Sequence, residues 1–320
     1  MDLEEQTLHY YIKVFSFLIV LSILLFYLYI FFYKKIETNS DTITILKAEK
    51  IENVLKTNIN NISNLEIQLI KIYYFLNKII KNKFIHFGNF NIKNISSIYD
   101  FLKIIYNPSN VLNKVTIIEG SSIFQLEEEL SKYFDDYYMI SYENIIADTY
   151  FFVTNVNYNV FVNNLKEIKK KYFKKYRNNI LLNKFSEDEI LIIGSLIEKE
   201  GLDYEDKKKI SSVILNRLNK NMKLQIDASV LFSITDGKYD LGRKLSFDDL
   251  KIKHPYNTYH IYGLPPKPIS YVGKKTLDII FENYQSDFLF YFFDNSLNRH
   301  IFSKTFEEHK NKLNDYRNNK

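Results

Sequence analysis

The 320-residue sequence contains no cysteine and few glycines and prolines, 8 and 5 respectively. Without cysteine, the chain has no disulfide, no thiolate zinc site and no cysteine nucleophile. Its 6 histidines lack metal-ligand spacing, and we find no glycine-rich phosphate loop, nucleophile elbow or dinucleotide fingerprint. We therefore expect an activity that uses neither a metal ion nor another cofactor.

An excess of one charge is also missing, because 43 basic residues face 38 acidic ones and the net charge is only +5. This balance gives no case for a nucleic acid partner. The content of 46% hydrophobic and 16% aromatic residues is sufficient for a substantial core. The length suggests two or three domains.

One long apolar run stands near the start of the chain, from Val14 to Tyr33, without a charged residue. As a helix, these residues would span roughly 30 Å, the thickness of a hydrocarbon core. A cleaved signal peptide is the alternative, but no small-residue cleavage site follows the run. We predict a transmembrane helix over 14–33, with residues 1–13 as a short cytoplasmic N-terminus. Lysines flank both ends, so charge alone does not decide the orientation.

Residues 36–160 alternate β-like runs with amphipathic helical patterns. Val115–Ile118 predicts a strand, and Ser121 or Ser122 predicts the N-cap of a helix that carries Ile123, Leu126 and Leu130. An earlier copy of this βα unit begins at Ile43. Two such units predict a small α+β module over 36–160.

Residues 161–185 are basic and interleaved with aromatic side chains. We interpret this stretch as a connector with a solvated helix face between two domains, and a polyanion-binding patch is the alternative.

A helix with a clear start and end follows from Ser186. Ser186 and Glu189 form the pattern of a capping box, and Gly201 is the residue type favoured just past a helix end. At 3.6 residues per turn, Glu200 falls near the middle of the apolar face, whereas Glu198 points elsewhere.

The remaining elements are predicted from similar local signals. Asp203 is expected to cap the next helix, whose buried stripe includes Arg217, and a buried guanidinium calls for a carboxylate. Asp287–Phe293 and His300–Phe302 predict a β-hairpin. Thr305 and Glu308 predict a second capping box for a terminal helix.

A carboxyl group on an apolar helix face is costly to ionise, so it pairs with a cation or has a raised pKa. A glutamic acid that stays protonated near neutral pH is suited to donate a proton to a glycosidic oxygen. On spacing alone, a structural or surface role for Glu200 is the favoured interpretation.

Three of the five prolines stand at positions 265, 266 and 268, which predicts a rigid loop. The loop follows Tyr256, Asn257 and Tyr259. Their phenol rings are suited to stack on sugars, and the Asn257 amide to bind an acetamido group. A structural turn packed by tyrosines is the alternative. Gln225 and Asp227 carry no specific signal by themselves.

Several ordered motifs resemble those of the endolytic murein transglycosylase, or YceG-like, family across nearly the whole chain. The motifs are Ser195–Glu200, Val213–Leu218, Met222–Asp227, Pro255–Tyr259, Gly263–Ile269, and Phe302–Thr305 with His309. Upstream, Val115–Leu130 is similar to the LysM-like subdomain of the family. Gly201 departs from the pattern, because the family usually has threonine there.

The resemblance implies an α+β protein with a single-pass anchor, a LysM-like module over 36–160 and a catalytic domain over 186–320, outside the cytoplasmic membrane. It implies cleavage of the β-1,4 bond between N-acetylmuramic acid and N-acetylglucosamine in peptidoglycan, which limits glycan length, with wall synthases as partners. Glu200 would be the catalytic acid, with Glu198 as the alternative. The implied substrate-binding residues are Asn216, Arg217, Gln225, Asp227, Tyr256, Asn257, Tyr259 and Pro265. A hydrolytic muramidase and a non-catalytic wall-binding scaffold remain the alternative functions.

Overall fold

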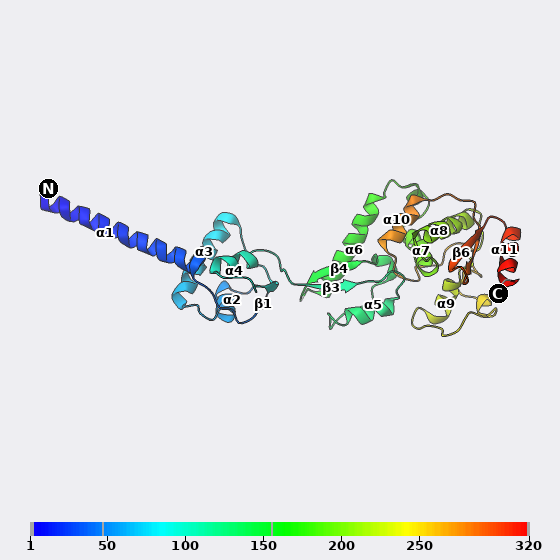
Figure 1. The fold of residues 1–320 in the computed structure, drawn as a ribbon, viewed down its shortest axis with the longest axis horizontal. Helices are drawn as coiled ribbons and strands as arrows, with labels where there is room; N and C mark the ends of the chain where they lie inside the picture. The colour runs from blue at the N-terminus through cyan, green and yellow to red at the C-terminus, as the bar shows by residue number, and fades with distance from the viewer. Residues whose placement is uncertain (1–2, 47, 155, 319–320) are drawn as a thin grey trace. The chain divides into compact units, whose positions relative to one another are not determined.

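The computed structural model describes residues 3–46, 48–154 and 156–318. The predicted mixed α+β class is confirmed, since helices are combined with three two-stranded sheets in the part described (Figure 1). The chain forms two compact units. Unit 1 comprises residues 1–113 and 151–156, and unit 2 comprises residues 114–150 and 157–320.

Unit 1 packs its helices on one small sheet. In chain order, its elements are α1 (Leu3–Leu28), the π-helix η1 (Tyr29–Tyr33), β1 (Thr42–Ile45), α2 (Ile51–Asn58), α3 (Asn64–Lys81), β2 (Gly88–Asn91) and α4 (Ile98–Ile105). Strands β1 and β2 are antiparallel, with Thr42 opposite Asn91. The buried core combines side chains of α2, α3 and α4 with both strands.

Helix α1 is long and apolar enough to cross a membrane over His9–Tyr33, by length and composition alone. The side chains from His9 to Phe26 are exposed. Ile30 and Phe31, by contrast, are each only 1% exposed and belong to the core of unit 1. The predicted run of 14–33 therefore ends inside the folded unit and not at its border.

The first predicted βα pair forms, and the second forms in part, since its strand covers 112–116 and not the predicted 115–118. The first consists of β1 and α2 in unit 1. In the second, strand β3 (Leu112–Thr116) pairs with β4 (Thr149–Val153), and a capping box of Ser122 and Gln125 opens α5 (Ile123–Leu130), which belongs to unit 2. The structure thus divides the chain near residue 113, within the module predicted for 36–160.

Unit 2 is built around α7 (Glu187–Glu200), in which every residue from Ile190 to Ile197 is buried. The capping box of Ser186 and Glu189 is present as predicted. The other main helices are α6 (Tyr158–Lys175), α8 (Tyr204–Asn219), α9 (Asp227–Thr235), α10 (Lys274–Glu282) and α11 (Phe306–Asn318), with short 3-10 turns at Tyr142–Asn144, Ile180–Asn183 and Asp249–Lys251. As predicted, Asp203 caps α8.

The predicted connector over 161–185 is wrong as a linker, because α6 is part of the unit 2 core. Phe161, Leu165 and Phe173 are buried. The hydroxyls of Tyr172 and Tyr176 both bind Asp278 of α10. Aromatic side chains at helical spacing thus form a packed face, while the lysines between them stay in solvent.

The predicted hairpin is confirmed: β5 (Phe290–Asp294) pairs with β6 (Arg299–Ser303), and Tyr291 lies opposite Phe302. The second capping box forms only in part. The Glu308 N–H donates to Thr305 Oγ1 at 3.2 Å, but the Glu308 carboxylate accepts from the N–H of Lys304 and not from that of Thr305.

Candidate active site

Glu200, the last residue of α7, meets two other elements of unit 2 through its half-buried carboxyl group. Oε1 accepts a long hydrogen bond of 3.5 Å from the N–H of Ala228, in the first turn of α9. Oε2 accepts one of 3.3 Å from the hydroxyl of Tyr291 on β5. The carboxyl group is therefore held by one donor at each oxygen.

The pKa of the Glu200 carboxyl is raised above its ordinary value. Burial is the main cause, and the negative charge of Asp227 adds to the rise. The Ala228 N–H, His300 and the Tyr291 hydroxyl lower the pKa in part, because each favours the carboxylate. A raised pKa together with donors that stabilise the anion suits a group that gives up a proton and then takes one back.

Glu198 has a different environment, although it lies only two residues away on the same helix. Its side chain is 2% exposed and forms an ion pair with Lys207 of α8. Glu198 also accepts a hydrogen bond of 3.0 Å from the N–H of Gly273, at the start of α10. The carboxylate thus joins three helices and has the contacts of a structural residue.

Asp227 and Tyr259 lie beside Glu200 and bind each other. The Tyr259 hydroxyl donates to Asp227 Oδ1 at 2.6 Å. Burial raises the pKa of Tyr259, and the Asp227 carboxylate adds to this rise. Asp227 itself is exposed, so it combines access to solvent with a fixed orientation.

Arg217 corrects the expectation of a carboxylate partner. The guanidinium is buried, but it donates to backbone carbonyls: Nε to Leu289 at 2.6 Å, and Nη1 to Leu224 at 2.7 Å and to Lys223 at 3.2 Å. A carbonyl oxygen satisfies such a donor without a second buried charge. Burial lowers the pKa of Arg217. The side chain thus holds the loop before α9 against the start of β5.

Asn216 is likewise engaged with the backbone. Its amide nitrogen donates to the carbonyls of Ser286 at 2.8 Å and Phe288 at 3.0 Å. Both contacts position the segment that leads into β5, which carries Tyr291.

Asn257 does not face a ligand as predicted, because its side chain is completely buried. Its amide donates to the carbonyls of Leu250 at 3.0 Å and Ile252 at 2.8 Å, and its oxygen accepts from the N–H of Tyr259 at 2.9 Å. No amide donor is left for an acetamido group, and the residue instead fixes the loop that carries Tyr259.

Gln225 and Tyr256 are the two remaining predicted contacts near the loop that carries Tyr259. Gln225 is exposed and has a positive φ of 51°, and its N–H donates to the carbonyl of Thr258 at 3.2 Å. Tyr256 is partly buried against Phe232 of α9, with the ring centroids 4.8 Å apart.

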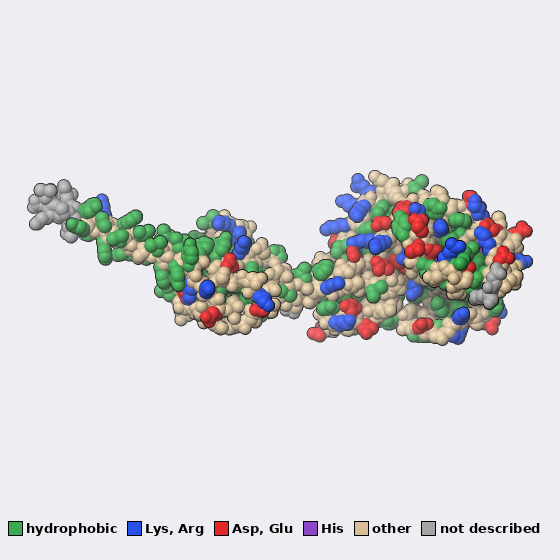
Figure 2. All heavy atoms as spheres, in the orientation of Figure 1, with side chains coloured by type: hydrophobic (Ala, Val, Ile, Leu, Met, Phe, Trp, Pro, Cys, Tyr) green, Lys and Arg blue, Asp and Glu red, His purple; other side chains and the backbone are tan. Residues whose placement is uncertain are grey.

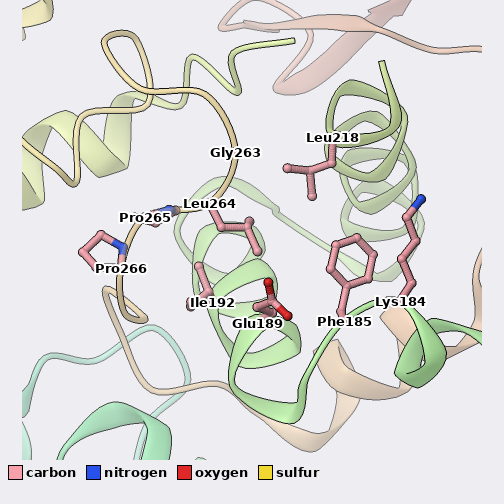
Figure 3. A pocket seen from close by; sticks show the side chains of 9 residues that line it. All are labelled: Lys184, Phe185, Glu189, Ile192, Leu218, Gly263, Leu264, Pro265 and Pro266. Atoms are coloured by element: carbon pink, nitrogen blue, oxygen red, sulfur yellow. The ribbon is translucent and has the colours of Figure 1, made fainter. Parts of the chain in front are cut away.

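Pro265 is buried and lines a cavity of about 400 Å³ with Lys184, Phe185, Glu189, Ile192, Leu218, Gly263, Leu264 and Pro266 (Figure 3). Glu189 lies 11 residues before Glu200 on α7, or roughly 16 Å along the helix axis. This cavity is therefore separate from the Glu200 carboxyl group.

A larger cavity, of about 580 Å³, lies in unit 2, and Glu200 is not among its lining residues. Ala228, whose N–H faces Glu200, lines it together with Lys199 and Ile269. Its other walls are Gly120, Ser122, Phe124, Gln125 and Glu128 around α5, and Leu231, Phe232, Thr235, Gly237, Lys238, Tyr239, Asp240 and Leu241 on and after α9. We call this cavity the α5–α9 groove. Polar and aromatic side chains from around α5 and α9 form its walls, and its links to Glu200 are the neighbouring Lys199 and Ala228.

Three residues of this environment were not predicted from the sequence: Tyr291, His300 and Asp206. His300 Nδ1 binds Asp206 Oδ2 at 2.8 Å, and its ring lies edge-on to that of Tyr291 at 5.3 Å. The alternation of side chains along a strand places Tyr291 on the opposite face from Phe290 and Phe292. No local signal shows which of the two faces packs against α7.

Among the residues that the structure describes, no group of three or more histidines, aspartates and glutamates is arranged to hold a metal ion.

The fold and the site define a mixed α+β protein with a single raised-pKa carboxyl group at the end of a buried helix. The YceG-like family matches residues 36–315 of the chain. The chain belongs to the YceG-like family.

Named relatives agree with this assignment. The chain is similar to an endolytic murein transglycosylase of Bacillus subtilis, with 38% identity over 43% of this chain and 37% of that protein. It is also similar to one of Streptococcus pneumoniae, with 31% identity over 47% of this chain and 27% of that protein. The match thus spans less than half the length of these relatives. A putative yceG-like protein of Listeria monocytogenes, whose crystal structure is known, shares the fold, with a TM-score of 0.52 and 24% identity over 87% of this chain and 100% of that one.

Proposed function

We propose that the chain is a membrane-anchored endolytic murein transglycosylase and that Glu200 is its catalytic acid. The observation that carries the proposal is the environment of Glu200: a carboxyl group of raised pKa, with a donor at each oxygen. One of these donors, Ala228, also lines the α5–α9 groove. The names of the similar proteins from Bacillus and Streptococcus support the same reaction.

In the proposed reaction, protonated Glu200 gives its proton to the oxygen that joins N-acetylmuramic acid to N-acetylglucosamine. The bond between that oxygen and the anomeric carbon then breaks. Glu200, now a carboxylate, takes the proton of the muramoyl 6-hydroxyl, and the 6-oxygen bonds to the anomeric carbon. The products are a new N-acetylglucosamine end and a 1,6-anhydro ring, and no water is consumed.

One carboxyl group is sufficient for this scheme, because the substrate's acetamido group helps to stabilise positive charge at the anomeric carbon. The Ala228 N–H and the Tyr291 hydroxyl are the groups that would stabilise the Glu200 carboxylate between the two proton transfers. We assign the glycan strand to the α5–α9 groove. Asp227 and Tyr259 are proposed substrate contacts at the end of the groove.

The position of the enzyme follows from its substrate, so we place α1 in the cytoplasmic membrane with units 1 and 2 on the outer side. The LysM-like role of residues 36–160 and contacts with wall synthases stay predictions.

The test is mass spectrometry of the products released from purified peptidoglycan by the full chain in detergent. Full-length protein is required because Ile30 and Phe31 belong to the unit 1 core. Wild type should give anhydromuramoyl ends, and Glu200→Gln should reduce the rate by a factor of about 100 or more. Glu198→Gln is the matched control and should still form the same products.

The other outcomes are equally informative. Reducing ends in place of anhydro ends would identify a hydrolytic muramidase. A folded protein that binds glycan without releasing products would be a scaffold. Equal activity of Glu200→Gln and wild type would remove Glu200 from the chemistry.

A further inference from the structure

Helix α3 of unit 1 has two opposite apolar faces, of which only one is covered. The covered face contributes Ile67 and Ile70 to the core of unit 1. The opposite face consists of Leu65, Ile72, Phe75, Leu76, Ile79 and Ile80, each 48–73% exposed. At 3.6 residues per turn, these six residues form one continuous stripe along the helix. We call it the α3 stripe.

The stripe continues into the loop after the helix, where Phe84 and Phe87 are 45% and 50% exposed. Single exposed apolar side chains are normal, but contiguous exposed patches mark interaction sites. Burying this stripe against a partner would remove its apolar surface from water, which is favourable. The described part of the chain contains no element that covers it.

Contacts within unit 1 place α3 beside the end of the apolar helix α1. Lys34, directly after the run, pairs with Glu66 of α3 at 2.6 Å. The ring of Phe31 packs against that of Tyr73 of α3, with the centroids 4.8 Å apart. Helix α3 therefore lies at the level where the candidate membrane span enters the folded unit.

The stripe also lies on the side of unit 1 that would face a membrane spanned by α1. Figure 1 shows α3 on the side from which α1 leaves the unit, whereas α2, α4 and β1 lie beyond it. The core is formed with these elements, so the opposite face of α3 is turned away from them. Hydrophobic side chains along α1 and on the adjoining part of unit 1 are seen in Figure 2.

The charged side chains at the C-terminal end of α3 are positive, whereas Lys71 in the middle of the helix is paired with Glu52 of α2 at 2.8 Å. Lys78, Lys81 and Lys83 are all exposed at the C-terminal end of α3, and the only acidic residue of the helix, Glu66, is buried and paired with Lys34. A helix with phenylalanine, leucine and isoleucine on one face and lysines beside it is typical of helices that lie in the membrane interface. Lysines at such positions contact lipid phosphates.

We propose that α3 is an interfacial helix whose stripe enters the headgroup region of the same bilayer that α1 spans. The lysines at 78, 81 and 83 meet anionic lipid headgroups there. This second, shallow contact holds unit 1 flat against the membrane next to the anchor. The inference rests on the membrane anchor of the proposed function, but not on its chemistry.

The absence of tryptophan from the sequence makes a direct test possible. Phe75→Trp introduces a single indole at an exposed position of the stripe. The full chain is reconstituted in liposomes that contain phosphatidylglycerol and brominated phosphatidylcholine, and tryptophan emission is recorded. Two controls carry their single tryptophan elsewhere: Leu21→Trp in α1, and Leu46→Trp directly after β1, where Leu46 is 64% exposed. Figure 1 shows strand β1 on the side of unit 1 away from α1.

We expect Phe75→Trp to shift its emission to the blue and to lose emission most strongly with lipids brominated near the headgroup. The emission of Leu21→Trp should be quenched most by bromine deep in the acyl chains. The emission of Leu46→Trp should not be quenched by bromine at either depth. If Leu21→Trp is quenched while Phe75→Trp and a second variant, Ile79→Trp, are not, the interfacial helix is refuted and the anchor stands. If no variant is quenched, both the interfacial helix and the membrane anchor are refuted. The peptidoglycan product assay then still tests the proposed chemistry on its own.

Discussion

The hydroxyl of Tyr259 donates a hydrogen bond of 2.6 Å to Oδ1 of Asp227, at the first residue of α9. Burial raises the pKa of Tyr259, so the hydroxyl remains protonated and keeps the Asp227 carboxylate in place. The negative charge next to Glu200 is therefore fixed by the fold. It is one of the two causes that raise the pKa of Glu200.

Replacing Asp227 by asparagine should shift the pH dependence of activity. Without the negative charge, the Glu200 carboxylate is easier to form, so the pKa of Glu200 falls and less of the acid is protonated at neutral pH. We expect the alkaline limb of the pH profile of kcat/KM in the peptidoglycan assay to move to lower pH. Tyr259→Phe is the control, because it keeps the charge and should move the limb less. An alkaline limb in Asp227→Asn identical to that of wild type would contradict the assigned cause.

Glu200→Gln should change stability in a pH-dependent way. Because the pKa of Glu200 is raised in the folded protein, the unfolded chain ionises first once the pH exceeds the ordinary value of 4.5. Wild type therefore loses stability as the pH rises from there through the folded-state pKa, whereas glutamine does not titrate. We expect the variant to have a higher Tm than wild type at pH 7–8 and a similar Tm near pH 4. Calorimetric scans at both pH values check this, and a Tm difference that is the same at both would speak against a raised pKa.

Glu198→Gln should destabilise unit 2 and leave the reaction type unchanged. Glutamine still accepts from the Gly273 N–H, but it leaves the largely buried Lys207 without its ionic partner. We expect a loss of about 2 kcal/mol in the free energy of unfolding, measured by chemical denaturation. The double variant Glu198→Gln with Lys207→Met removes both charges and should recover part of this loss. A stability equal to that of wild type would mean that the ion pair makes no net contribution.

Gly201 is required for close approach and not for its backbone angle, since its φ is −82°. A Cβ atom at this position would lie 2.3 Å from Lys207 Cγ and 3.2 Å from the carbonyl oxygen of Ile197. We expect Gly201→Ala to cost about 1–3 kcal/mol in the free energy of unfolding, because Lys207 must move away from Glu198.

A double-mutant cycle identifies the cause of that cost. In a Lys207→Ala background the clashing Cγ is absent, so the same glycine replacement should cost less. Equal costs in both backgrounds would assign the effect to the Ile197 carbonyl instead.

Much of the local structure is predictable from the sequence. The capping box of Ser186 and Glu189, the cap at Asp203 and the hairpin before α11 each depend on neighbours a few residues apart, and all three are present. The position of Glu200 on the apolar face of its helix follows from the helical period. The pattern of a single helix therefore places Glu200 on the apolar face, and the family resemblance is needed to propose it as the acid.

The partners of that acid are not predictable in this way. Tyr291 lies 91 residues after Glu200, and Ala228 lies 28 residues after it. No short pattern encodes such contacts, because they depend on how α9 and β5 pack on α7. For the same reason, the sequence suggests that Asn257 binds a sugar and that Arg217 pairs with a carboxylate, whereas both side chains bind backbone carbonyls.

The sequence by itself determined the apolar N-terminal run, the capped starts of α7 and α8, the hairpin of β5 and β6, and the place of Glu200 on its helix, since these follow from periodicity and capping among neighbouring residues. Only the tertiary structure decided that the end of the apolar run belongs to a folded core, and that residues 114–150 belong to unit 2 while 151–156 belong to unit 1. It also decided that Glu198 forms an ion pair with Lys207, whereas Glu200 accepts from Ala228, a residue that lines the α5–α9 groove. These outcomes depend on which apolar faces of distant elements pack against each other, and such packing is not encoded in any single element.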